Sequence, residues 1–131
     1  MGENETVVEP IVSPLQESIL STIKKLIGFE DDYTQFDMDL IIHINTAFAS
    51  LAQIGSNLKE GFSITDKNNL WSEYTTNTAI LEPVKMYVYL KTKMVFDPPA
   101  SSMVIETMKQ TINELEFRIQ ISADSSGKEE T

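Results

Sequence analysis

The sequence contains no cysteine and only one histidine, His43, so the side chains on which most metal sites and covalent catalysts depend are nearly absent. Without cysteine there are no disulfides and no thiolate ligands, and an intracellular setting fits this composition. A lone histidine has no second ligand of its type, and His43 lies near no recognised nucleophile motif. We therefore interpret His43 as a packed or boundary residue and expect no metal site, no cofactor and no catalytic residue.

Motifs for phosphate binding and catalysis are also missing. There is no glycine-rich phosphate loop, paired-histidine zinc motif or nucleophile elbow. Asp37 and Asp39 resemble half of a calcium-binding loop, but the EF-hand spacing and its later glycine and glutamate are absent. Both residues fit the start of a helix better, because acidic side chains stabilise its positive end. An enzyme or a metal protein is therefore the least favoured class.

Long apolar runs and basic residues are scarce. No apolar stretch approaches the ~18 residues of a membrane span, and the N-terminus lacks the pattern of a secretory signal, so we expect a soluble, cytoplasmic protein without membrane contact. Ten basic residues stand against twenty acidic ones, which gives a net charge of −10. This balance disfavours binding to nucleic-acid phosphates, because such binding needs clustered lysine and arginine. The simplest interpretation of the acidic runs is a solvated surface.

What the sequence does contain is helical periodicity, in a length of 131 residues that suits one domain. Two apolar-periodic segments fill residues 78–122, and they are separated by a proline pair at 98–99 that cannot continue a helix. We expect a helical hairpin. Its first helix has Pro83 in the first turn and stops near Phe96, and a serine at 101 or 102 caps its second helix.

Further helices are expected earlier in the chain. The first begins at Ser13, with Pro14 at its first position, and stops at Gly28 in a left-handed conformation. The second opens at Asp37 and ends before Gly55. Residues 62–65 alternate as one short strand or extended segment, and a short helix is expected over 67–74.

The predicted fold class is therefore mainly α: a small bundle of four to five helices with a C-terminal helical hairpin, one short extended segment and flexible termini. The predicted domain organisation is a flexible N-terminal arm over 1–12, a helical domain over 13–122 and a disordered tail over 123–131.

The last predicted helix has two apolar faces. Its core face lies within ~60° on a helical wheel and comprises Val104, Met108, Ile112, Leu115 and Ile119. Met103, Phe117 and Ile121 project almost opposite. Either this helix is wrapped on both sides within one domain, or the second face is a subunit interface. Further interface candidates are Phe62, Ile64, Trp71, and Val7 and Ile11 of the arm.

Several stretches together resemble the small head-tail connector (head-completion, or adaptor) proteins of long-tailed bacteriophages and prophages. The resemblance covers about residues 15 to 122 and consists of packing and boundary residues. The similar stretches are 18–25, 36–39, 42–45, 61–64 with Trp71, 84–102 and 114–118.

The resemblance implies a structural virion protein that forms a ring beneath the portal, joins the head to the tail and extends the DNA channel. Its implied partners are copies of itself, the portal protein and a tail-side completion or terminator protein, although the free protein can be a monomer. The implied location is the virion neck, with assembly in the host cytoplasm. DNA would pass without specific binding, and Glu30, Asp31 and Asp32 are candidates for channel-facing acids.

One alternative comes from a different class. An acidic protein can mimic DNA and occupy a nucleic-acid-binding protein as an inhibitor. That alternative predicts a monomer or dimer that binds a basic partner with strong salt dependence.

Overall fold

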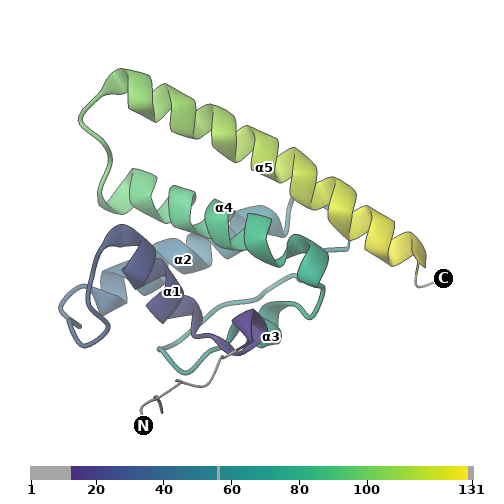
Figure 1. Ribbon diagram of the computed structural model, residues 1–131, viewed down its shortest axis with the longest axis horizontal. Helices are drawn as coiled ribbons and strands as arrows, with labels where there is room; N and C mark the ends of the chain where they lie inside the picture. The colour runs from purple at the N-terminus through teal and green to yellow at the C-terminus, as the bar shows by residue number, and fades with distance from the viewer. Residues whose placement is uncertain (1–12, 56, 130–131) are drawn as a thin grey trace, which may run out of the picture.

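Helices form nearly all of the regular structure in the computed structural model, which describes residues 13–55 and 57–129 (Figure 1). Within these residues there is no β-strand, and a single isolated bridge joins Ser18 to Leu70. The mainly helical prediction is confirmed. The elements are the 3-10 turn η2 (Pro14–Gln16) and the helices α1 (Ile19–Ile27), α2 (Asp37–Leu51), α3 (Trp71–Tyr74), α4 (Thr78–Phe96) and α5 (Ser102–Glu129).

Helix α4 is the central element of the bundle. It packs along α5 on one side and against α2 and α1 on the other (Figure 1). Because α4 has neighbours on both sides, it buries a broad face rather than a narrow stripe. Its buried apolar residues are Ile80, Leu81, Val84, Tyr87, Val88 and Leu90.

The helical hairpin of α4 and α5 is formed as the sequence predicts. The chain leaves α4 at Phe96, and Oγ of Ser101 accepts a hydrogen bond from the Val104 N–H at 3.4 Å at the start of α5. The position of Pro83 is a correction. Because Asn77 caps α4 one residue before Thr78, Pro83 lies inside the helix rather than in its first turn.

The first helix begins later than predicted. Ser13 caps only η2, because the backbone becomes extended at Glu17 and Ser18 and hydrogen-bonds with the backbone of residues 69–71. The side chain of Ser18 then caps α1. Helix α1 ends at Gly28, which has a φ of 116°, as the sequence predicts.

Residues 62–65 are extended but do not join a sheet. The side chain of Asn45 takes the place of a neighbouring strand: its Oδ1 accepts from the Ile64 N–H at 2.8 Å and its Nδ2 donates to the Ile64 carbonyl at 3.0 Å. The short helix expected over 67–74 is reduced to α3. Before it, the side chain of Asn69 accepts a hydrogen bond from the Thr65 N–H at 2.8 Å and holds a turn.

The acidic connection between α1 and α2 is held against the end of α4 by aromatic rings. Phe29 stacks on Tyr33 with ring centroids 5.5 Å apart, and the rings of Phe29 and Phe96 meet edge-on with centroids 6.0 Å apart. His43 is half-buried, and the centre of its ring lies 6.5 Å from the centre of the Phe96 ring. This position agrees with its interpretation as a boundary residue.

The C-terminal helix is longer than predicted. The expected boundary of the tail is Ser122, whereas α5 continues to Glu129. Ala123 is 3% exposed and lies one turn after Ile119, so it extends the buried face of α5. Asn57 also donates a hydrogen bond to Asp124 at 3.3 Å. The predicted arm over 1–12 lies outside the described residues.

Candidate assembly interface

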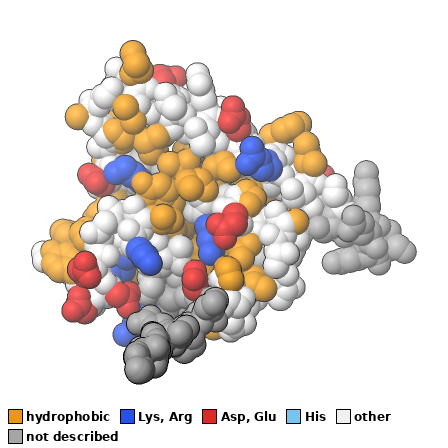
Figure 2. Space-filling model, in the orientation of Figure 1, with side chains coloured by type: hydrophobic (Ala, Val, Ile, Leu, Met, Phe, Trp, Pro, Cys, Tyr) orange, Lys and Arg blue, Asp and Glu red, His pale blue; other side chains and the backbone are white. Residues whose placement is uncertain are grey.

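The outer face of α5, defined here as Met103, Phe117 and Ile121, is open to solvent. These side chains are 78%, 66% and 48% exposed, whereas the opposite face of the helix is packed against the bundle. The domain therefore does not wrap α5 on both sides. Figure 2 shows hydrophobic side chains at the surface over α5 and in a band between α5 and α4. The residues of the packed face are Met108, Ile112, Leu115, Ile119 and Ala123.

One hydrogen bond joins α4 to α5 directly beside the exposed Phe117. The buried hydroxyl of Tyr87 on α4 donates to Oε2 of Glu116 at 3.0 Å. Burial, and then the hydrogen bond to Glu116, raise the pKa of Tyr87 well above its usual range, so the donor stays protonated. The sequence pattern alone offers Glu116 no partner. Phe117 follows Glu116 directly, and its side chain projects about 100° further around the helix axis, into solvent.

The tip of the hairpin is more open than the sequence predicts. Val104 of α5 belongs to the predicted core face, yet it is 46% exposed, and Val95 of α4 is 64% exposed. The reason is the linker over 97–101, which separates the two helix ends (Figure 1). An open groove of about 350 Å³ lies between the helices here, lined by Lys91, Met94, Val95, Lys109, Ile112 and Asn113.

A second exposed apolar surface lies on α2 and was missed by the sequence analysis. Met38 is 72% exposed and Ile42 is 57% exposed. Their four-residue spacing, away from the buried face of α2, is a signal that could have found them. We call these two residues the outer face of α2.

Two of the other interface candidates are core residues. Ile64 is 2% exposed and Trp71 is fully buried, so their side chains lie in the core of the domain and not on its surface, which corrects the expectation that they are exposed to a partner. Phe62 is half-buried, and its ring packs edge-on against Phe48 at 4.9 Å. Val7 and Ile11 lie outside the described residues.

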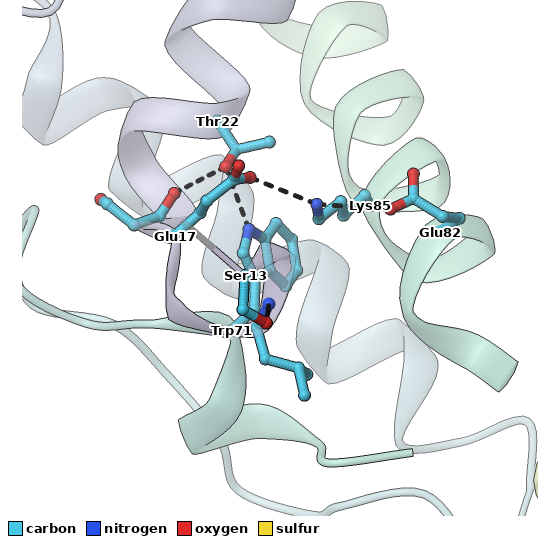
Figure 3. A network of polar contacts seen from close by, with 8 residues as sticks. Ser13, Glu17, Thr22, Trp71, Glu82 and Lys85 are labelled. Atoms are coloured by element: carbon cyan, nitrogen blue, oxygen red, sulfur yellow. Dashed lines mark hydrogen bonds and ion pairs between the residues drawn. The ribbon is translucent and has the colours of Figure 1, made fainter. Parts of the chain in front are cut away.

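Trp71 instead organises a polar network that joins the start of the domain to α4 (Figure 3). Its Nε1 donates to Oγ1 of Thr22 at 3.0 Å, and Nζ of Lys85 lies 5.9 Å from the centre of the indole ring. Lys85 also forms ion pairs with Glu17 and Glu82, both at 3.4 Å. These contacts join the start of α1, α3 and α4, so the network stabilises the fold.

The candidate channel acids lie on the loop between α1 and α2. Glu30, Asp31 and Asp32 are all exposed. Lys24, which is 2% exposed, holds this loop in place: its Nζ donates to the Asp31 carbonyl at 2.8 Å and pairs with Oδ1 of Asp37 at 3.0 Å. Glu30 and Asp32 form no ion pair with any described residue, so their charges point to solvent.

Among the described residues no group of three or more histidine, aspartate and glutamate side chains is placed to hold a metal ion. Nor is any helix in this part of the chain both long enough and apolar enough to cross a bilayer. The polar side chains mainly cap helices and join elements, whereas the exposed features are apolar faces on two helices. This combination is typical of a structural protein that contacts other protein chains.

Comparison with known proteins agrees with that class. The family model described as phage connector protein matches residues 19–126, which is most of the chain. The chain therefore belongs to the phage connector protein family, and its role is that of a structural head-tail connector protein of a phage. No curated protein and no solved structure matches it.

Proposed function

We propose that this protein forms a ring beneath the portal at the virion neck, where it joins the capsid to the tail and continues the DNA channel. The observation that carries the proposal is the outer face of α5, which leaves Phe117 66% exposed on a chain that belongs to the connector family. Exposed apolar clusters on small proteins usually mark association. A ring supplies that association. Identical copies joined by a head-to-tail contact form a closed ring when the rotation from each copy to the next adds up to a full turn.

The charge of the chain fits a channel through which DNA slides. A net charge of −10 repels the phosphate backbone, and Glu30 and Asp32, which form no ion pair with any described residue, carry negative charge on an exposed loop. Lys24 holds the backbone of that loop at Asp31, between the two acids. We infer that the loop faces the lumen and that DNA passes it without being bound.

The proposed partners are further copies of the chain, the portal protein above the ring and a tail-side completion or terminator protein below it. Assembly would take place in the host cytoplasm before the tail joins. The free protein can be a monomer, because the portal supplies the template on which the copies gather.

Size-exclusion chromatography with light scattering tests this function. The purified protein is measured alone and with purified portal protein from the same phage. We expect a complex that contains many copies of the chain for each portal. The proposal would be overturned in favour of a DNA mimic if the protein does not bind the portal and instead binds a basic nucleic-acid-binding protein in a salt-dependent manner.

A further inference from the structure

Two helices of the domain present the same local pattern to solvent. On α2, the outer face is Met38 and Ile42, and the residue directly after Met38 is Asp39. Residues four apart are neighbours on a helix surface, and the residue one position on lies about 100° around the axis. The α2 face is therefore an apolar pair with an acidic group along one edge.

The C-terminal part of the outer face of α5 repeats this pattern with the opposite charge. Phe117 and Ile121 are four residues apart, and the residue directly after Phe117 is Arg118. Arg118 therefore occupies the position relative to its apolar pair that Asp39 occupies on α2.

Neither charged group has a partner among the described residues. Asp39 and Arg118 are both exposed, and no ion pair or side-chain hydrogen bond joins either of them to a described residue. Several lysines, among them Lys25, Lys67 and Lys91, also lack an acidic partner among the described residues, so what distinguishes Arg118 is its place beside an exposed apolar pair. Lys24, Lys85 and Lys93, in contrast, all have acidic partners.

The two faces lie on different sides of the bundle. Helix α4 stands between α2 and α5, and each of these helices packs its buried face towards the bundle (Figure 1). Their outer faces are therefore directed away from the core on either side of the domain. Two different surfaces on different sides are what a head-to-tail contact between identical chains requires.

We propose that the outer face of α5 in one copy packs on the outer face of α2 in the next copy, with Arg118 beside Asp39. This inference rests on the ring proposed above and names the two surfaces that close it. A contact of α5 with α5 would bring two Arg118 side chains together, and a contact of α2 with α2 would do the same with two Asp39 side chains. Both arrangements are opposed by like charges and use only one face per copy.

Charge reversal tests the pairing in the presence of portal. Asp39→Arg and Arg118→Asp are each expected to raise the protein concentration needed for half-maximal ring assembly by roughly tenfold or more. The double variant, which carries both changes in one chain, should recover most of the loss because opposite charges again face each other. Lys67→Asp, on an exposed turn away from both faces, is the matched control and should assemble normally.

Cross-linking locates the two faces independently, and the absence of native cysteine makes it specific. Ala49→Cys places a thiol on the exposed side of α2 near Ile42, and Glu114→Cys places one on α5 near Phe117. Rings are assembled on portal from an equal mixture of the two single variants and treated with a short flexible bis-maleimide. We expect covalent dimers from the mixture and few from either variant alone.

Each outcome decides the inference. Rescue by the double charge swap together with cross-links between unlike variants supports it. The pairing is overturned, and the ring itself is not, if rings form normally but cross-link only between like variants. The same holds if neither charge reversal changes assembly. If unmodified protein forms no ring with portal, the proposed function fails, and the pairing fails with it. The two failures are therefore distinguished by whether the unmodified protein assembles.

Discussion

The hydroxyl of Tyr87 donates a hydrogen bond to Oε2 of Glu116 at 3.0 Å, and this contact joins α4 to α5 one residue before the exposed Phe117. It links the buried core to the surface that we propose for assembly. Loss of this contact is therefore expected to lower the stability of the domain next to that surface.

Tyr87→Phe should lower the free energy of unfolding by about 1–2 kcal/mol, because a hydrogen bond to a carboxylate is lost and Glu116 is left half-buried without its donor. Urea denaturation followed by circular dichroism measures this. Glu106→Gln, on the exposed side of α5, is the control and should change stability little. Equal stability of Tyr87→Phe and the unmodified protein would show that the contact contributes nothing.

Lys24 is expected to be the most sensitive lysine of the chain. Lys24→Met keeps the apolar stem but removes the bonds to the Asp31 carbonyl and to Asp37, so it should cost roughly 3 kcal/mol and loosen the acidic loop. Its neighbour Lys25 is exposed, and Lys25→Met should have almost no effect. Thermal unfolding of both variants makes the comparison, and equal melting temperatures would contradict it.

Alkaline pH should destabilise the fold through Tyr74. Burial raises the pKa of Tyr74 to about 12 from its ordinary value of 10.0. The unfolded chain therefore loses the phenolic proton first. The stability contributed by the protonated group is complete below pH 10 and is lost as the pH rises towards 12, by about 1.4 kcal/mol per pH unit.

Tyr74→Phe isolates this effect, because the Tyr74 hydroxyl has no hydrogen-bond partner among the described residues. The variant should match the unmodified protein at pH 7 and lose less stability between pH 10 and pH 12. Asn68→Ala, an exposed change that removes no titratable group, should leave the pH profile unchanged. Identical alkaline profiles for all three proteins would refute the role of Tyr74.

Much of the helical hairpin could be predicted because its signals are local. The proline pair at 98–99 stops α4 wherever the rest of the chain lies, and the buried face of α5 repeats every three or four residues. The start of α1 could not be predicted in this way. Ser13 and Ser18 are both good caps, and the choice between them depends on backbone bonds to residues 69–71, far away in sequence.

The interface candidates also divide into residues with a clear local signal and residues whose position depends on distant parts of the chain. Phe117 and Ile121 were predicted to lie outside the core because they oppose a regular buried face, and both are exposed. The alternation over 62–65 and the short helix after it are too brief to show which side Ile64 and Trp71 face. The partner of Ile64 is the side chain of Asn45, nineteen positions earlier, and no local rule predicts that contact.

The acidic loop carries the prediction about DNA. Replacing Glu30 and Asp32 together by lysine should slow DNA exit from assembled phage several-fold, because positive side chains in the lumen would hold the phosphate backbone. Asp31 is left unchanged, since Ser21 bonds to it. Glu60→Lys, on an exposed segment after α2, is the control. Unchanged ejection kinetics in the double variant would place the loop outside the channel.

Phe117→Lys should abolish assembly and leave the fold intact, because Phe117 is exposed in the single chain. We expect unchanged circular dichroism and melting temperature, with at least a tenfold loss of portal-dependent assembly by light scattering. Asn68→Lys, an exposed change of the same charge before α3, should assemble normally. Unfolding of Phe117→Lys would instead assign Phe117 to the core.

The most direct measurement is an electron cryo-microscopy reconstruction of the protein bound to its portal. The account predicts a closed ring in which Phe117 and Ile121 of each copy are covered by the neighbouring copy. A reconstruction in which these two side chains face solvent, or in which single copies bind the portal without touching each other, would contradict it.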